Sequence, residues 1–274
     1  MAVGQFKIGA IIQARLGSTR LPNKVMLPLS VGSEKTIISE VIERVKDVSE
    51  ISNVIVATSI SKVNDDLESY IDTLKVECYR GSENDVLSRF YDIIIKHNFE
   101  YVIRLTGDNP IVDSILLKEF ISNFISNNLD YSCSNNLPLG CNFEMMKASE
   151  IIKAYENTED LFDKEHVTPF VKRNANKTSN FTFNNIKIIS NLRLTIDYAS
   201  DYAFINLIYA MLKDKSKSVK NIINLIEDNL WLLDINNINF QKIKFKNIDE
   251  EIENILPLIK ERELNRLQKL LINL

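Results

Sequence analysis

The chain alternates short apolar segments rich in β-branched residues with amphipathic segments of helical period. Ile8–Gln13 and Asn53–Thr58 have the composition of buried strands, whereas the apolar residues of Thr36–Val48 recur at the spacing of one helix face. Strands separated by helices of this length pair in parallel, because each connection must cross over the sheet to reach the next strand. The sequence therefore predicts an α/β fold, a three-layer α/β/α sandwich around a mostly parallel, doubly wound sheet.

The alternation continues along the chain and loosens after about Asp130. Further strands are predicted at Val76–Tyr79, Tyr101–Thr106, Tyr131–Ser134, Phe143–Met146, Phe181–Ile188 and Leu192–Ile196. Further helices are predicted at Asn64–Leu74, Ser114–Asn127, Ser149–Glu156, Lys164–Arg173 and Ser200–Leu212. Ser82 and Asp85 have the spacing of a capping box, which predicts another helix that ends near His97.

Length and local composition divide the chain into two parts. At about 150 residues per domain, 274 residues indicate one large domain with a smaller addition. We expect the α/β domain over residues 1–214 and a C-terminal helical extension over residues 215–274. A hairpin insert near residues 180–190 is a candidate subunit contact, so we expect a homodimer. The extension ends in an amphipathic run, Ile248–Leu274, which Pro257 is expected to break or kink.

Glycine is scarce, and its spacing excludes two classes of nucleotide-binding loop. The chain has seven glycines, and no two lie closer than five positions. A GxGxxG dinucleotide or kinase loop is therefore impossible. Gly4 and Gly9 have P-loop spacing, but Ala10 and Ile11 follow where Lys and Ser or Thr are required. The chain is not a Walker-type NTPase.

Charge and cysteine usage exclude several further classes. A net charge of −4 argues against a nucleic-acid binder, which needs a basic face to neutralise phosphates. No apolar run approaches the ~18 residues of a membrane span, and the first residues do not resemble a signal peptide. The three cysteines lack CxxC spacing, and the two histidines are too few for a histidine-built zinc site. We expect a reduced, cytoplasmic protein without a structural metal, a membrane or a nucleic-acid partner.

The loop after the first predicted strand concentrates groups that bind phosphate. The strand ends at Gln13, and the loop carries three cations and a Gly-Ser turn, namely Arg15, Gly17, Ser18, Arg20 and Lys24. In a doubly wound sheet, ligands bind at the carboxyl ends of the strands. Backbone N–H groups can approach phosphates where Gly17 has no side chain, and the cations neutralise the remaining charge. The loop is a candidate polyphosphate cradle, and a solvated basic loop is the alternative.

Two aspartates follow predicted strands. Asp108 lies in the segment RLTGDNP, where Gly107 leaves bare backbone beside a carboxylate that can hold Mg²⁺ against phosphate oxygens. Asp197 ends the strand predicted at Leu192–Ile196, immediately before a helix. Turn formation by Asp108 and helix capping by Asp197 are the alternatives.

The segment AIIQARLGSTRLPNKVMLPL resembles the opening signature of cytidylyltransferases that activate acidic sugars. It is most similar to the branch typified by spore coat polysaccharide biosynthesis protein F, and more distantly to the 3-deoxy-manno-octulosonate and acylneuraminate cytidylyltransferases. The resemblance covers about residues 8–212. It implies a nucleotide-diphospho-sugar transferase-like sheet, and it makes residues 1–214 a nucleotidyltransferase domain. It also implies that the CTP triphosphate is held by Ala14, Arg15, Gly17, Ser18, Arg20 and Lys24.

The resemblance also implies roles for residues outside the opening signature. Asp108 and Asp197 match the family's two metal-binding aspartates, and two such carboxylates at one sheet edge can clamp Mg²⁺ on the α-phosphate. Arg80 and Ser88 match positions near the cytosine base in relatives. For this segment, helix capping by Ser82 and Asp85 explains the pattern without a ligand.

Three residues are candidate contacts of the acceptor. The segments Pro138–Glu144 and Glu165–Pro169 match parts of the branch that line the acceptor site, which implicates Glu144 and His166. Arg104, on the strand that leads to the Gly-Asp turn, is suited to a bidentate grip on a carboxylate or phosphate. An ion pair between Arg104 and Glu144, and a structural role for His166 in a helix, are the alternatives.

Together these features predict a Mg²⁺-dependent cytidylyltransferase for surface polysaccharide or glycan biosynthesis. An oxygen of an acidic sugar or sugar derivative attacks the α-phosphorus of CTP, with Arg15, Lys24 and Asp108 as the catalytic residues. The acceptor's identity stays open, because Asn142 stands where many relatives carry aspartate. A nucleotide-sugar-dependent glycosyltransferase is the main alternative, but it usually needs an Asp-x-Asp motif that this sequence lacks. A catalytically inactive nucleotide-binding protein is the other.

Overall fold

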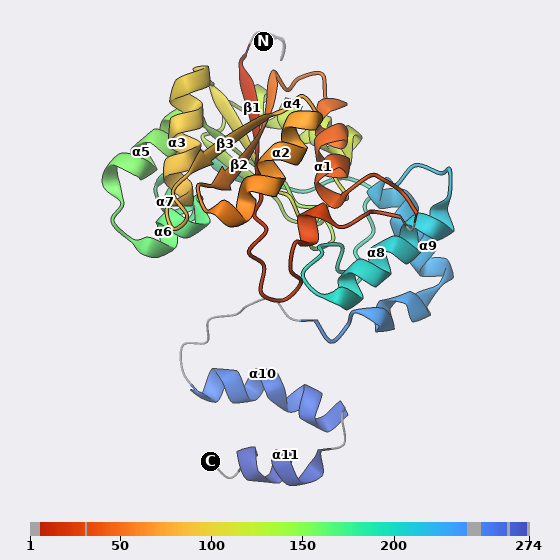
Figure 1. Ribbon diagram of the computed structural model, residues 1–274. Helices are drawn as coiled ribbons and strands as arrows, with labels where there is room; N and C mark the ends of the chain where they lie inside the picture. Colours follow the sequence, from red (N-terminus) through yellow and green to blue (C-terminus); the bar gives the residue numbers. More distant parts are fainter. Residues whose placement is uncertain (1–5, 31, 240–247, 262–263, 273–274) are drawn as a thin grey trace. The chain divides into compact units, whose positions relative to one another are not determined.

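The computed structural model describes residues 6–30, 32–239, 248–261 and 264–272 (Figure 1). Internal contacts divide the chain into two compact units, Met1–Ile238 and Asn239–Leu274. Every described strand belongs to the first unit. Of the helices in the described ranges, none is long and apolar enough to span a bilayer.

The described strands of the first unit form one mostly parallel sheet. Its seven strands are β1 (Ile8–Gln13), β2 (Asn53–Ser59), β3 (Glu77–Gly81), β4 (Tyr101–Thr106), β5 (Tyr131–Ser134), β6 (Glu144–Lys147) and β7 (Thr178–Phe181). They are ordered β3-β2-β1-β4-β6-β5-β7. Only β6 runs antiparallel to its neighbours β4 and β5, and the other described pairs are parallel. The predicted parallel, doubly wound core is therefore present, with one reversed strand beside β4.

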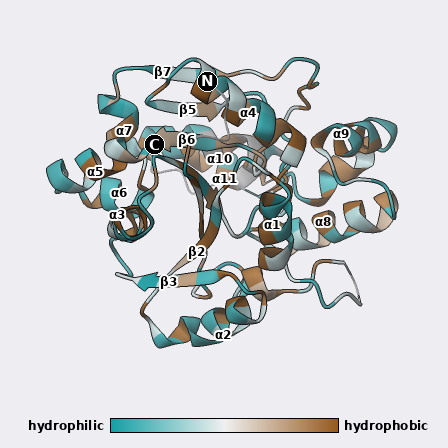
Figure 2. Cartoon of the chain, turned by 90° about the horizontal axis from the view of Figure 1, so that it is seen from above, coloured by the Kyte–Doolittle hydropathy of each residue, from teal (hydrophilic) through white to brown (hydrophobic). Residues whose placement is uncertain are grey.

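Helices cover both faces of this sheet. The α-helices of the first unit are α1 (Ile37–Lys46), α2 (Asp65–Thr73), α3 (Val86–His97), α4 (Ser114–Ser126), α5 (Ala148–Asn157), α6 (Leu161–His166), α7 (Pro169–Asn174), α8 (Ala199–Leu212) and α9 (Val219–Asp228). Three short 3₁₀ helices, η2 (Lys24–Met26), η3 (Lys62–Asn64) and η4 (Leu230–Ile235), lie in the connections. Figure 2 shows α1 and α8 on one side of the strands and α3 and α5 on the other.

The alternation of side chains along each strand produces two apolar cores. In β1, Ala10 and Ile12 pack into the core that contains α1, α2, α4, α8 and α9, whereas Ile11 packs into the core of α3, α5 and α7. Successive side chains of a strand point to opposite faces, so one buried strand contributes to both layers. All three of these residues are fully buried, which confirms the predicted three-layer sandwich.

Helix α3 starts three positions later than the capping box predicts, because its N-cap is Asp85 and not Ser82. Asp85 is the N-cap, and its side chain accepts a hydrogen bond from the N–H of Ser88 at 2.8 Å. Ser82 instead accepts from the N–H of Asp85 at 3.1 Å, before the helix begins. The carboxylate of Asp85 therefore satisfies the exposed N–H group at the start of the helix.

The predicted strand at Leu192–Ile196 is wrong, although its alternation is real. Leu194 is fully buried, and its N–H donates to the carbonyl of Leu139 at 2.7 Å, but a single bridge between Leu139 and Arg193 is the extent of the pairing. Gly140 lies so close to this segment that a Cβ there would stand 2.5 Å from the backbone nitrogen of Thr195. The segment is extended and buried, but no neighbouring strand continues beside it.

The predicted hairpin at Phe181–Ile188 is also wrong. Phe181 is the last residue of β7, which pairs in parallel with β5. The chain then turns inward, because the N–H of Phe183 donates to the Asn136 side chain at 2.9 Å and the Phe183 ring is buried. The aromatic contacts of Phe183 with Phe143 and Phe181 hold this turn against the core. The homodimer remains a prediction.

The helix predicted at Lys164–Arg173 consists of two short helices. α6 ends at His166, Val167 has a φ of 69°, and α7 begins at Pro169. Proline lacks an N–H group and its ring collides with the preceding turn, so a helix cannot continue through this position without distortion.

The first unit continues beyond residue 214. Val219, Ile222 and Ile226 of α9 and Leu232 of η4 are buried in the core that contains α8. Apolar burial therefore attaches these elements to the α/β unit, and the boundary between the units lies after Ile238. In the second unit, α10 (Ile248–Glu261) and α11 (Asn265–Ile272) contact each other, and α10 continues through Pro257.

Candidate active site

The loop after β1 is closed by its own backbone. The carbonyl of Leu16 accepts hydrogen bonds from the N–H groups of Ser18 at 2.8 Å and Asn23 at 3.2 Å. The N–H of Leu16 donates to the side chain of Asn64 at 2.8 Å. At Gly17, no atom lies within 4 Å of the place a Cβ would take. The backbone at the tip of this loop is therefore open to a ligand such as a phosphate.

Lys24 joins the two predicted metal-binding aspartates. Its ammonium lies 2.5 Å from Oδ2 of Asp108 and 2.8 Å from Oδ1 of Asp197. Lys24 begins η2 at the end of the loop, Asp108 follows β4, and Asp197 precedes α8. Parallel strands bring the ends of β1 and β4, and with them Lys24 and Asp108, to one edge of the sheet. Asp197 reaches them because the N–H of Ile196 donates to the carbonyl of Asp108 at 3.0 Å. The predicted proximity of Asp108 and Asp197 is present.

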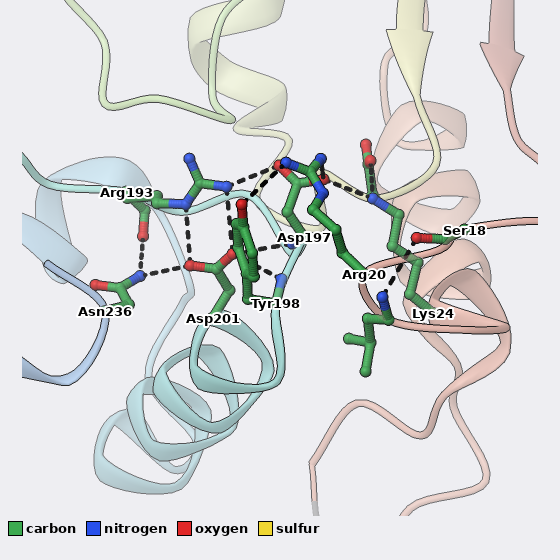
Figure 3. Close-up of polar contacts among 10 residues, drawn as sticks. Ser18, Arg20, Lys24, Arg193, Asp197, Tyr198, Asp201 and Asn236 are labelled. Carbon is green, nitrogen blue, oxygen red and sulfur yellow. Dashed lines mark hydrogen bonds and ion pairs between the residues drawn. The ribbon is translucent and has the colours of Figure 1, made fainter. Parts of the chain in front are cut away.

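Arg20 lies on the same carboxylate. Its guanidinium is 2.7 Å from Oδ1 of Asp197 and 3.4 Å from the hydroxyl of Tyr198, and it stacks 4.9 Å from the centre of the Tyr198 ring. Burial opposes the charge of Arg20, but the hydrogen bond to Tyr198 and the attraction of Asp197 outweigh it and raise its pKa. Figure 3 shows Arg20 and Lys24 of the loop facing Asp197.

The carboxylate of Asp197 is surrounded by cations on both sides. Its Oδ2 accepts from Arg193 at 2.7 Å, and Arg193 also binds Asp201 at 3.0 Å. Burial disfavours the charged form of Asp197, but Lys24, Arg20 and Arg193 together lower its pKa. The resulting Asp197 cluster pairs three cations with three carboxylates and comprises Arg20, Lys24, Arg193, Asp108, Asp197 and Asp201.

The donor set of this cluster fits Mg²⁺. Asp108 and Asp197 bind one ammonium group, so their carboxylates lie close enough to share a small cation. The described residues contain no group of three or more His, Cys, Asp or Glu side chains arranged for a metal. Mg²⁺ commonly takes one or two protein carboxylates and completes its shell with water and substrate phosphates. Asp108 and Asp197 are the residues that would hold it.

Three further cradle residues lie at the mouth of the loop. The side chain of Arg15 is 58% exposed, and its guanidinium is 3.8 Å from the carboxylate of Glu83. Ser18 accepts a long hydrogen bond, 3.5 Å, from the N–H of Leu21. The N–H of Ala14 is used by the backbone, since it donates to the carbonyl of Ala57 at 3.1 Å. Arg15 and Ser18 therefore have the exposure that a phosphate contact requires, whereas Ala14 continues the sheet.

Arg80 and Ser88, the predicted contacts of the cytosine base, bind other groups of the protein. Arg80 pairs with Asp65 at 2.8 Å and Glu68 at 2.6 Å, and it also donates to the carbonyl of Ser59. The hydroxyl of Ser88 donates to the carbonyl of Asp85 at 2.8 Å. These contacts attach the end of β3 to α2 and close the first turn of α3, so a role at the base stays a prediction.

A buried chain of hydrogen bonds connects the cradle to the loop after β3. Asn64, which is fully buried, accepts from the N–H of Leu16 and donates to the hydroxyl of Ser59 at 2.7 Å. Ser59 in turn donates to Glu83 at 2.5 Å. The sequence pattern carries no signal for this connection, because its members come from three different segments. It joins two loops that both lie at the carboxyl edge of the sheet.

A second buried carboxylate lies on the other side of β4. Glu144 accepts from Arg104 at 2.7 Å, Lys172 at 2.6 Å, the hydroxyl of Tyr131 at 2.7 Å and the hydroxyl of Thr168 at 3.3 Å. These residues form the Glu144 cluster, in which the ion pair between Arg104 and Glu144 left open above is present. Burial opposes the charge of Glu144, but Arg104 and Lys172 lower its pKa to about 2.

The Glu144 cluster has an excess of positive charge, since two cations surround one carboxylate. Arg104 also donates to the side chain of Gln13, the last residue of β1, at 3.1 Å, so the cluster extends to the strand that feeds the cradle. His166 is exposed at the end of α6, and its ring lies 4.4 Å from that of Phe162. Thr168, two residues further on, makes the contact with Glu144.

Comparison with known proteins identifies relatives over nearly the whole chain. A sequence profile described as cytidylyltransferase matches residues 9–243. The spore coat polysaccharide biosynthesis protein SpsF of Bacillus subtilis is 33% identical over 231 residues, which are 80% of this chain and 93% of SpsF. The structure of a cytidylyltransferase from Leptospira borgpetersenii serovar Hardjo-bovis has 30% identity and a TM-score of 0.75, covering 88% of this chain and 100% of that one.

A more distant structure shares the fold. The CMP:2-keto-3-deoxy-manno-octonic acid synthetase complexed with CTP has a TM-score of 0.56 at 16% identity, and the match covers 75% of this chain and 99% of that one. These neighbours confirm the predicted nucleotide-diphospho-sugar transferase-like sheet. SpsF and the family profile confirm the resemblance drawn from the opening signature. The chain belongs to the cytidylyltransferase family and is a nucleotidyltransferase.

Proposed function

We propose that this enzyme is Mg²⁺-dependent and transfers CMP from CTP to an acidic sugar or sugar derivative, for the synthesis of a surface polysaccharide or glycan. The observation that carries the proposal is the contact of Lys24 with both Asp108 and Asp197 at the end of the cradle. This contact joins a residue expected to bind phosphate to the two residues expected to bind the metal, at one edge of the sheet. The similarity to SpsF, a spore coat polysaccharide biosynthesis protein, and the CTP bound to the distant synthetase support the substrate class.

In the proposed reaction, an acceptor oxygen forms a bond to the α-phosphorus of CTP while the bond to the β-phosphate breaks. Arg15, Arg20 and Lys24 balance the charge that develops on the departing pyrophosphate, and the backbone at Gly17 and the hydroxyl of Ser18 receive phosphate oxygens. Mg²⁺, when bound by Asp108 and Asp197, supplies charge neutralisation at the α-phosphate. Positioning and electrostatics account for most of the rate enhancement in transfers of this type.

Lys24 must change partners for this reaction. Its ammonium compensates the carboxylates of Asp108, whose side chain is 24% exposed, and of Asp197, which is buried, and these would otherwise repel each other. A cation held by Asp108 and Asp197 would supply that compensation, which would leave the ammonium of Lys24 available for the phosphates. Metal and nucleotide are therefore expected to bind cooperatively, because each relieves the electrostatic cost of the other.

The Glu144 cluster is proposed as the acceptor end of the site. Its excess positive charge favours an acceptor with a carboxylate or phosphate. Arg104 is the proposed contact, Glu144 orients it, and His166 lines the entrance. Arg80 and Ser88 are assigned to the nucleotide end indirectly, through the loop that they hold at the start of α3. We also propose that the enzyme acts as a cytoplasmic homodimer.

The nucleotide is tested by thermal unfolding. CTP with Mg²⁺ should raise the melting temperature by about 5–10 °C at a hundredfold excess over Kd, and EDTA should remove most of the gain. UTP and ATP are the matched controls for the base. If no nucleoside triphosphate changes the melting temperature, the cradle assignment is wrong.

The acceptor is tested by pyrophosphate release from CTP against nonulosonic acids, sugar acids, sugar phosphates and neutral sugars. We expect turnover with an anionic member and none with the neutral sugars. A neutral sugar as the best acceptor would contradict the assignment of the Glu144 cluster.

A further inference from the structure

Asp201 lies behind the site and holds the backbone of Asp197. Its side chain is fully buried. Oδ2 of Asp201 accepts hydrogen bonds from the N–H groups of both Asp197 and Tyr198, each at 3.0 Å. Oδ1 accepts from Nε of Arg193 at 3.0 Å and from the side-chain amide of Asn236 at 3.0 Å. Asp201 therefore fixes the peptide that carries the metal-binding carboxylate.

Arg193 fixes the carboxylate itself. One of its terminal nitrogens donates to Oδ2 of Asp197 at 2.7 Å, while its Nε holds Asp201. This leaves Oδ1 of Asp197 directed at Lys24 and Arg20 (Figure 3). Arg193 is only 5% exposed, so water contributes little to holding this charge in place.

Asn236, from a distant part of the chain, binds both Arg193 and Asp201. It follows η4 and is 2% exposed. Its amide donates to the backbone carbonyl of Arg193 at 3.1 Å as well as to Asp201. The neighbouring Leu232 is fully buried in the core, which anchors η4 against the unit. The segment after α9 thus reaches the reaction site through one neutral side chain.

We propose that Arg193, Asp201 and Asn236 are positioning residues that determine which oxygen of Asp197 faces the metal and the phosphates. The inference rests on the proposed function, since it takes Asp197 as a metal ligand. Side chains that orient a metal ligand change metal affinity when they are removed, typically by 10- to 100-fold. Asn236 is the informative member, because its removal leaves every charge of the Asp197 cluster in place.

Asn206 provides a matched control in the same unit. It is 9% exposed, accepts from the N–H of Ser30 at 2.7 Å and donates to the carbonyl of Tyr202 at 2.9 Å. Asn206→Ala therefore deletes a buried amide with two hydrogen bonds, as Asn236→Ala does. If only the loss of stability matters, both variants should change metal affinity equally. If Asn236 positions Asp197, only Asn236→Ala should bind the metal more weakly.

The experiment titrates each protein with Mn²⁺ and CTP, without an acceptor, and follows binding by the relaxation enhancement of water protons. Wild type and Asn206→Ala should bind with the same affinity, and Asn236→Ala should bind about tenfold more weakly. Asp197→Asn is the reference for complete loss of the ligand. Melting temperatures without metal report the structural cost of each change, and Asn236→Ser replaces Asn236→Ala if the latter does not fold.

The outcomes separate two kinds of failure. If wild type binds Mn²⁺ with CTP and Asn236→Ala matches Asn206→Ala, the positioning role is wrong and the proposed function stands. If wild type shows no enhancement, or if Asp197→Asn binds like wild type, the metal assignment fails and this inference fails with it.

Discussion

The Asp197 and Glu144 clusters distribute charge differently. The Asp197 cluster pairs three cations with three carboxylates, whereas in the Glu144 cluster two cations surround one. A balanced cluster can exchange one of its cations for a metal ion, and a cluster with excess positive charge can attract an anion directly. Under the proposed function, the first arrangement suits a metal–phosphate complex and the second suits an acidic acceptor. Arg104 within β4 belongs to the second, and Asp108 just after β4 belongs to the first.

The largest expected effect is the loss of turnover when a proposed metal-binding carboxylate of the Asp197 cluster is neutralised. Asp108→Asn and Asp197→Asn should each lower kcat by about two to three orders of magnitude, because a charge stabiliser of the transition state is lost. Asp163→Asn is the control, since Asp163 is also buried and paired with an arginine, Arg173, but belongs to neither cluster. Steady-state pyrophosphate release measures all three. Near-normal turnover by Asp197→Asn would mean that Asp197 only balances its neighbouring cations and is not a metal ligand.

The second prediction concerns the pH dependence of stability at Glu144. Its pKa is lowered from 4.5 to about 2, so its contribution to stability is complete above pH 4.5 and is lost as the pH falls toward 2. The shift corresponds to about 3 kcal/mol. Wild type should exceed Glu144→Gln by about this free energy of unfolding at pH 7, and the difference should fall to about half near pH 3.5.

Urea denaturation of both proteins between pH 7 and pH 3.5 provides the test. A difference that does not change with pH would mean that Glu144 stabilises the fold by packing or neutral hydrogen bonds. The charge assignment of the Glu144 cluster would then be wrong.

The smallest expected effect concerns the acceptor. Arg104→Gln should raise the acceptor KM at least tenfold and change the KM for CTP by less than about threefold, because a charge-assisted contact contributes ~1.5–3 kcal/mol. Lys172→Gln removes the same charge from the cluster at a half-exposed position and should raise the acceptor KM less. If Arg104→Gln weakens CTP instead, Arg104 belongs to the nucleotide end.

The elements with strong local signals could be predicted from the sequence. The strand at Ile8–Gln13 has the same bounds in the structure, and the helix at Ser200–Leu212 begins one residue earlier, at Ala199. The segment Leu192–Ile196 shows what a local pattern cannot predict. Its alternation reports burial correctly, but a strand also needs a neighbour to pair with, and the neighbour is decided by the packing of distant segments.

The candidate site shows the same limit. Arg15 to Lys24 could be proposed as phosphate contacts because the loop places three cations and a Gly-Ser turn within a few residues of each other. Asn236 was not, since its partners Arg193 and Asp201 lie 43 and 35 residues away and its surroundings in the sequence carry no motif. The ion pairs of Arg80 could not be predicted either, because Asp65 and Glu68 reach it only once α2 packs beside β3.

By itself, the sequence determined the period of the elements with strong local signals, the charges of the cradle loop and the family to which the chain belongs. These features are local, because they depend on residue types at short spacing. The tertiary structure alone decided that Lys24 would lie between Asp108 and Asp197, that Glu144 would receive two cations, and that the chain beyond α9 would return to hold Arg193. The physical reason is that the pairing of buried charges depends on which distant segments exclude water together, and short-range patterns carry no information about that choice.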